Sequence, residues 1–256
     1  MLKIPTSLTL ILLLLVARPA AAIETVTLYS YHDHPPFVTG PHAGLTEDLA
    51  LYLNSLAPDH YRFVVKLLPR ARLNAQLAGW INGDCTGQDC AANWLVAWVN
   101  PAWGFIKGNE DPYQWQPLFE DSNAIVSLRD RAFEYHAAES LDGRILLGMR
   151  GHHYVGIDDR VEQGRVKRID GNDERDNLLK LLAERGDAAL LPTSTIDYFL
   201  THDARLAPLR ARFFVSPTRH QRYTRFLMLP GTRGDLLQLV RDARLEQWAR
   251  DAFDQR

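Results

Sequence analysis

Residues 25–54 read TVTLYSYHDHPPFVTGPHAGLTEDLALYLN and predict a strand, a loop and a helix in that order. The first residues form a short β run of Thr, Val, Leu and Tyr. A loop rich in His, Pro and aromatic residues follows, and after Gly44 leucines recur at helical spacing, at positions 45, 49, 53 and 56. Open α/β sheets bind ligands at the carboxyl ends of their strands. The stretch therefore predicts rings and imidazoles exposed at a ligand-binding edge.

The first 22 residues predict a cleavable export signal. Lys3 supplies a positive charge, residues 8–16 form an apolar run, and three alanines that end at Ala22 follow Pro19 as a cleavage site. An uncleaved anchor helix is the alternative, but the apolar run is short for the roughly 30 Å hydrocarbon core of a bilayer. We therefore expect a periplasmic product that is not stably inserted in a membrane.

The balance of charges in the chain argues against nucleic acid as a partner. The chain has 29 Lys and Arg against 31 Asp and Glu, whereas nucleic-acid binding needs a concentrated basic face. A small-molecule solute or another protein is the expected partner, with no nucleic acid and no cofactor.

Cys85 and Cys90 are the two cysteines of the chain, and in an exported protein they predict a disulfide. Metal binding by this pair is the less favoured alternative.

Strands and helices alternate along the rest of the chain, which predicts an α/β fold with mostly parallel sheets and helices on both faces. We expect strands at 61–67, 94–99, 124–128, 144–149, 188–191, 213–215 and 226–229, and helices at 45–56, 70–80, 175–185 and 236–253.

No Pro-, Gly- or Ser-rich linker separates these segments, so ordered chain must cross any lobe boundary. Crossings near residues 119–123 and 216–223 would give one lobe of residues 23–121 and 219–256 and a second lobe of residues 122–218.

The order and spacing of these segments resemble the periplasmic solute-binding proteins of family 3, which have the type 2 periplasmic-binding fold and are usually associated with amino-acid uptake. The motifs that carry the resemblance are LYSYHDHPPF, GLTEDLALYLN, YRFVVKLLPRARLNAQL, and ILLGMRGHHY followed by GDAALLPTSTIDYFL. The segment CAANWLVAWVNPAWGF, with YQWQPLFEDSNAIVS after it, is similar to one subgroup. The resemblance implies two lobes joined by two crossover strands, a ligand in the cleft, and hinged closure on binding.

The chain departs from the amino-acid binders of that family at three places. The resemblance implies an Arg clamp on the first lobe, but residues 100–116 contain none and present Asn100, Trp103 and Lys107 instead. Residues 150–153 (RGHH) replace the family's Gly-Thr anion loop, and Pro192 with Thr193 stands where an ammonium-binding Asp would fall. We therefore expect a small polar or anionic solute, with Arg150 as a possible clamp from the second lobe.

Six residues of the first lobe are candidate ligand contacts because they lie near or after the ends of predicted strands: Tyr31, His34, Phe37, Trp98, Asn100 and Trp103. Aromatic rings at such an edge stack on apolar parts of a ligand, and the amide of Asn100 both donates and accepts hydrogen bonds. The alternative is that some of the rings fill the space between sheet and helix, that Trp98 belongs to the core, and that Asn100 only forms a turn.

On the second lobe, Arg150, His152, Tyr154 and Thr193 are the candidates. Exposed backbone N–H groups near a cation suit a carboxylate or phosphate. The alternatives are a solvated loop for the first three and a helix cap for Thr193. Arg70 and Arg72 begin a helix on the first lobe, where a solvated first turn or a salt bridge is the favoured role over a contact in the cleft.

No metal site is predicted, although His32 and His34 with Asp33 and His42 offer zinc-ligand chemistry on one loop. Alternate residues of an extended segment point to opposite faces, which separates Asp33 from the two imidazoles.

The predicted function is that of a monomeric periplasmic solute-binding protein that delivers its ligand to an inner-membrane ABC-type permease or reports to a membrane sensor. One alternative is an interaction protein with a modified cleft. Another is a small enzyme, in which His34 or His152 with Glu47 would act as acid and base. No G-x-S-x-G, P-loop or H-E-x-x-H motif occurs, so we do not predict an enzyme.

Overall fold

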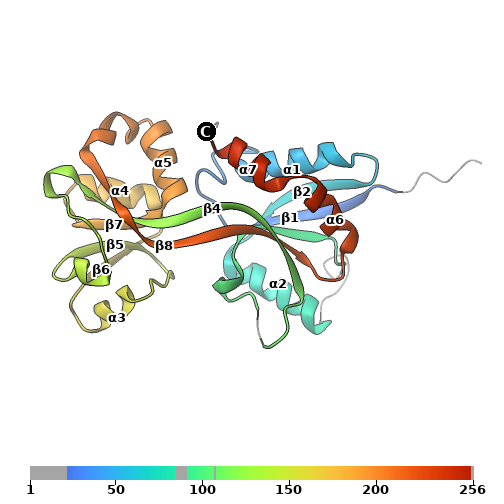
Figure 1. Ribbon diagram of the computed structural model, residues 1–256, viewed down its shortest axis with the longest axis horizontal. Helices are drawn as coiled ribbons and strands as arrows, with labels where there is room; N and C mark the ends of the chain where they lie inside the picture. The colour runs from blue at the N-terminus through green and yellow to red at the C-terminus, as the bar shows by residue number, and fades with distance from the viewer. Residues whose placement is uncertain (1–21, 85–90, 107, 255–256) are drawn as a thin grey trace, which may run out of the picture.

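Two long strands join the two lobes of this chain in the computed structural model, which describes residues 22–84, 91–106 and 108–254 (Figure 1). Strands β4 (Tyr113–Leu128) and β8 (Phe213–Pro230) pair antiparallel along their whole length and run through both lobes. The sequence predicted only short strands at 124–128, 213–215 and 226–229. The polar residues between them stay extended because each strand supplies the backbone partners of the other.

The strands of the described residues form one eight-stranded sheet in the order β2-β1-β3-β8-β4-β7-β5-β6. In lobe 1, β1 (Glu24–Ser30) pairs parallel with β2 (Tyr61–Leu67) and β3 (Trp94–Val99). In lobe 2, β5 (Ile145–Met149) pairs parallel with β6 (Lys167–Gly171) and β7 (Ala188–Pro192). The β3–β8, β8–β4 and β4–β7 pairings are antiparallel. The three strands that belong to one lobe alone therefore pair parallel, and every pairing that involves β4 or β8 is antiparallel.

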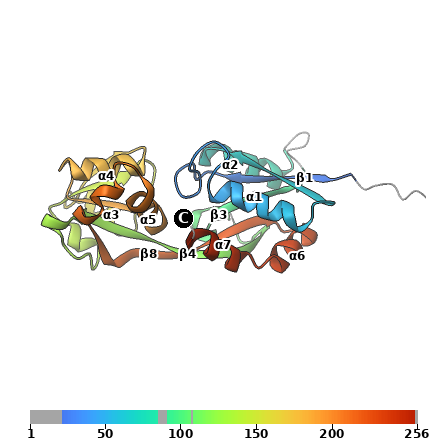
Figure 2. The same cartoon turned by 90° about the horizontal axis from the view of Figure 1, so that it is seen from above.

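Helices cover the sheet in both lobes (Figures 1 and 2). Lobe 1 carries α1 (Leu45–Leu56), α2 (Arg70–Asn82), α6 (Gly234–Asp242) and α7 (Leu245–Asp254). Lobe 2 carries α3 (Ile157–Glu162), α4 (Glu174–Leu182) and α5 (Thr193–His202). Short 3-10 turns are η2 (Pro101–Trp103), η3 (Arg129–Arg131), η4 (Ala138–Leu141) and η5 (Ala207–Arg212).

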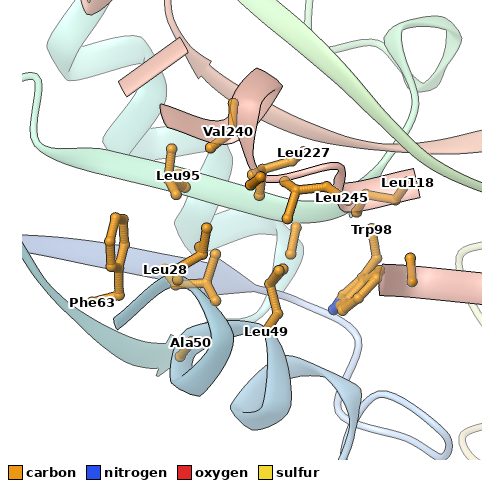
Figure 3. Close-up of a cluster of buried hydrophobic side chains, with 14 of the residues drawn as sticks. Leu28, Leu49, Ala50, Phe63, Leu95, Trp98, Leu118, Leu227, Val240 and Leu245 are labelled. Carbon is orange, nitrogen blue, oxygen red and sulfur yellow. The ribbon is translucent and has the colours of Figure 1, made fainter. Parts of the chain in front are cut away.

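The core of lobe 1 lies between α1, the sheet and the C-terminal helices (Figure 3). Leu28 of β1, Leu49 of α1 and Leu227 of β8 are fully buried there. The predicted leucine spacing of α1 thus supplies one wall of this core.

The loop between β1 and α1 folds back on itself at Gly44, which has φ of 119°. A Cβ at this position would lie 2.5 Å from the carbonyl oxygen of Phe37. The amides of Leu45 and Thr46 donate to the carbonyl oxygens of Pro36 and Phe37. This close approach requires glycine and fixes the loop that carries His32 to Phe37.

The C-terminal segment is two helices, whereas the sequence predicted one helix over 236–253. The break lies at Ala243 and Arg244, and Arg244 has a left-handed φ of 48°. In one continuous helix, Leu245 would be rotated by about 180° from Leu236. The break allows both leucines to be fully buried.

Two sequence predictions fall outside the described residues. The predicted signal peptide covers residues 1–22, of which only Ala22 is described. The predicted disulfide between Cys85 and Cys90 lies entirely outside the described residues. Within the described part of the chain, none of the helices has both the length and the apolarity needed to cross a membrane.

We expect Leu49→Ala to lower the free energy of unfolding by about 2–5 kcal/mol, because it leaves a cavity in the lobe 1 core. Leu51→Ala on the same helix is the matched control, since Leu51 is 66% exposed and should change stability by less than about 0.5 kcal/mol. Urea unfolding followed by circular dichroism measures both. Equal losses in the two variants would contradict this packing.

Candidate functional site

The carboxyl ends of the three parallel strands of lobe 1 form the edge that faces lobe 2 (Figure 1). The loop from Tyr31 to Phe37 follows β1, Arg70 follows β2, and η2 follows β3. Seen from above, β4 and β8 pass along one side of both lobes, and the loop after β1 lies on the side of lobe 1 nearest lobe 2 (Figure 2). Side chains from strands far apart in sequence therefore converge between the lobes.

A buried ion pair lies where β4 and β8 pass between the lobes. Arg225 of β8 donates from Nε to Asp121 Oδ2 of β4 at 2.8 Å, and the two side chains are 1% and 2% exposed. Arg225 also donates from Nη1 to the carbonyl oxygen of Trp98 at 3.1 Å and from Nη2 to Tyr223 Oη at 3.3 Å. A buried charge is tolerated when it is paired and hydrogen-bonded in this way.

Aromatic side chains surround the guanidinium of Arg225. Its central carbon lies 4.5 Å from the ring centroid of Phe37, 5.7 Å from that of Trp103 and 5.4 Å from that of Tyr223. Trp103 and Tyr223 pack edge to face at 5.2 Å. Burial raises the pKa of Tyr223, so the phenol stays neutral. Because the Arg225 side chain is only 1% exposed and is paired with Asp121, its role here is to hold the hinge strands and rings together.

Helix α5 begins with three hydroxyl residues, of which two bond to β4 and the third contacts lobe 1. Thr193 donates to the carbonyl oxygen of Ser122 on β4 at 3.0 Å. Ser194 donates from its backbone N and from Oγ to Asp121, at 3.2 and 2.8 Å. Thr195 Oγ1 lies 3.4 Å from His34 Nδ1 of lobe 1. The start of α5 therefore connects the hinge ion pair to the opposite lobe.

His34 contacts lobe 2 at a second point. Its Nε2 lies 3.8 Å from Glu174 Oε1, and the Glu174 side chain is only 6% exposed. Glu174 is the first residue of α4, where the helix dipole stabilises a negative charge. A cavity of about 420 Å³ lies beside this contact and is lined by residues of both lobes, including Asp33, Thr39, Tyr198 and His202.

His32 is half-buried next to Arg225, with its Nε2 3.4 Å from Arg225 Nη1. Desolvation, and then the positive charge of Arg225, lower the pKa of His32 well below its usual range; nearby His34 and His152 act in the same direction. His32 is therefore neutral at physiological pH.

The structure places the six candidates of lobe 1 at two depths. Tyr31, His34 and Trp103 are partly exposed at the edge that faces lobe 2. Phe37 and Trp98 are fully buried beneath them, and the indole N–H of Trp98 donates to Thr46 Oγ1 at 3.0 Å.

The amide of Asn100 accepts from the backbone N of Ala102 and donates to the carbonyl oxygen of Thr224. Its side chain therefore caps η2 and ties it to β8.

The lobe 2 candidates also divide into exposed residues and residues that are buried or bonded to the hinge. Arg150 and His152 are exposed on the loop after β5. Tyr154 is 3% exposed, its Oη accepts from the backbone N of Met149 at 2.9 Å, and burial raises its pKa to about 12. Thr193 is tied to Ser122. Tyr154 thus stabilises the loop after β5, and Thr193 stabilises the hinge strand β4.

Sequence reasoning missed Asp121, Glu174, Tyr223 and Arg225. The one available signal was a charged residue directly before an apolar strand, since Arg225 precedes the run FLML. A larger cavity of about 610 Å³ lies on lobe 2 near Tyr135, Arg160 and His220, away from these residues. Across the described ranges, no three His, Cys, Asp or Glu side chains are grouped to hold a metal ion.

No family model and no curated protein matches the chain. Solved structures do resemble it. The ligand-binding core of GluR0 in complex with L-glutamate has a TM-score of 0.63 at 13% identity and covers 92% of this chain and 98% of that one. A mutant of ArgBP from T. maritima has a TM-score of 0.59 at 15% identity, covering 90% and 92%. The VFT2 domain of Bordetella pertussis BvgS reaches 0.58 at 13% identity, again covering 90% and 92%. These likenesses show that the chain has the two-lobed type 2 periplasmic-binding fold.

We expect Arg225→Met to lower the free energy of unfolding by about 3–5 kcal/mol, because it leaves the buried carboxylate of Asp121 without its cation. Asp121→Asn should also destabilise the protein. The double variant should be more stable than the sum of the two losses predicts, since neither charge then remains unpaired. Urea unfolding of all four proteins measures this coupling, and additive losses would contradict the pairing.

We expect stability to fall between pH 7 and pH 5 partly through His32. Its pKa is lowered in the folded protein, so the unfolded chain binds more protons in this window and acid favours unfolding, by up to about 1.4 kcal/mol per pH unit. His32→Gln should flatten the pH profile of the unfolding free energy, whereas His42→Gln, at a side chain 93% exposed, should not. Parallel profiles for His32→Gln and the unaltered protein would contradict this assignment.

Proposed function

We propose that this protein captures a small polar or anionic solute between its two lobes. The supporting observation is the contact of His34 on lobe 1 with Thr195 and Glu174 on lobe 2, which joins two strand-end edges across the hinge strands. Such edges are where open α/β sheets bind ligands. The proposed ligand contacts are Tyr31, His34 and Trp103 from lobe 1 and Arg150 and His152 from lobe 2.

The proposed mechanism is binding with hinged closure and no covalent chemistry. Strands β4 and β8 are the hinge, because they are the two long segments that connect the lobes. A solute that contacts both walls favours the closed arrangement in proportion to its extra affinity for it.

We further propose that the protein is a monomeric member of periplasmic solute-binding protein family 3, exported by residues 1–22 and serving an ABC-type permease. The sequence motifs support this assignment. Among the similar structures, GluR0 is in complex with L-glutamate and an ancestral arginine-binding protein is bound to arginine. An ordinary α-amino acid is less favoured here, because Thr193 is tied to the hinge at the position where an ammonium-binding Asp is expected.

A second candidate is a binding domain that reports to a membrane sensor or to a partner protein. The observation that favours it is the packing of Trp103 against Tyr223 and the burial of Arg225 in its pair with Asp121, which reduce the room and the accessible donors inside the lobe 1 edge.

The deciding experiment is a thermal-shift screen of residues 23–256 with amino acids, small carboxylates, polyamines, peptides and divalent metals. A solute at about 100 times its Kd should stabilise the protein by about 2.7 kcal/mol. Small-angle X-ray scattering with the same solute should show a smaller radius of gyration.

Variants connect a hit to the site. His34→Ala should weaken binding because it removes a wall residue, while His42→Ala, an exposed position in the same loop, should leave binding unchanged. No stabilisation by any member of the panel, with a folded sample, would reject solute capture and favour the sensor or interaction reading.

A further inference from the structure

Arg70 is a partly shielded cation at the edge of lobe 1 that faces lobe 2. The central carbon of its guanidinium lies 3.8 Å from the ring centroid of Phe105 and 5.0 Å from that of Tyr31. Nε donates to Asn74 Oδ1 at 2.9 Å, Nη1 to Tyr31 Oη at 3.2 Å and Nη2 to the carbonyl oxygen of Trp103 at 2.6 Å. The group is held in one orientation by neutral acceptors.

The charge of Arg70 has no carboxylate partner in residues 22–84, 91–106 and 108–254. Other shielded guanidiniums do have one: Arg225 pairs with Asp121, and Arg168 pairs with Asp158 and Asp170. The first turn of α2, which Arg70 begins, contains no acidic residue either. The lobe 1 edge therefore carries an uncompensated positive charge.

The hydrogen bonds of Arg70 leave room for a further acceptor. A guanidinium has five N–H groups, with one on Nε and two on each terminal nitrogen. The contacts to Asn74, Tyr31 and Trp103 use one on each nitrogen. One N–H thus remains on Nη1 and one on Nη2, which is the number of donors that a bidentate pair with a carboxylate uses.

The surroundings of Arg70 also fit a flat apolar group. Trp103 and Tyr31 are both partly exposed, and their rings belong to a continuous series of aromatic contacts with His32, Phe105 and Tyr223. Aromatic ligands stack favourably on such surfaces.

We propose that the cleft binds an aromatic carboxylate, with Arg70 pairing with its carboxylate group and Trp103 and Tyr31 packing on its ring. This inference rests on the proposed function and names its ligand class. An α-ammonium group is not needed, because the recognition comes from the acid and the ring.

The test uses phenylacetate, indole-3-acetate and benzoate, each compared with its neutral amide, and isothermal titration calorimetry of the purified protein. We expect the acids to bind at least about tenfold more tightly than the amides, as a charge-assisted pair requires. Arg70→Gln should abolish this preference. Arg70→Lys should keep part of it, since the charge remains without the second parallel hydrogen bond.

Arg72→Gln is the matched control, because it removes the same charge from an exposed position in the same helical turn and should keep the preference for acids. Circular dichroism verifies that each variant is folded. Failure of all three acids to bind, equal binding of acids and amides, or an equal loss in Arg72→Gln would overturn the proposal. If the acids fail but the lobes close on a neutral or cationic solute from the wider screen, the proposed solute capture stands and only the aromatic-carboxylate ligand class is rejected.

Discussion

Strands β4 and β8 must remain paired while they leave one lobe and enter the other, and this pairing constrains everything built on them. Apolar cores hold the two strands inside each lobe, but the residues between the cores are polar. Between the cores, Arg225 and Asp121 hold the two strands together through a buried ion pair. The other polar atoms of this pair bond to Trp98, Tyr223 and Ser194. A buried pair costs desolvation energy, so its value lies in fixing which residues face each other.

The same pair determines which charges remain available at the lobe 1 edge. Because Arg225 is buried and paired with Asp121, it does not act as an open anion clamp, whereas Arg70 has no carboxylate partner in the described parts of the chain. Glu174 lies on the opposite lobe at the start of α4 and faces His34. The two walls therefore present different charged groups, Arg70 on lobe 1 and Glu174 with Arg150 on lobe 2, which favours ligands with one defined orientation.

Local patterns in the sequence were enough for much of the fold. The apolar run at 94–99 is β3, and the leucine spacing at 45–56 is α1. Residues after parallel strands, such as Tyr31, His34 and Trp103, were placed at the lobe edge by the topology alone. The rest depended on distant partners: Arg225 and Asp121 are 104 positions apart in the chain, and no periodicity reports such a pair. The break at Arg244 arises because two buried faces of the C-terminal segment must meet one core.

The three hydroxyl residues that open α5 explain how the hinge and the lobe contact are linked. Ser194 bonds to Asp121, and the next residue, Thr195, lies against His34. His34 shares its loop with His32, which returns to Arg225. These contacts form a closed ring in which the bond between Asp121 and Ser194 is buried, whereas the 3.4 Å contact between Thr195 and His34 is long and partly exposed. In the proposed opening of the lobes, we therefore expect the ring to break at His34, because that contact costs less to break than the buried bond between Asp121 and Ser194.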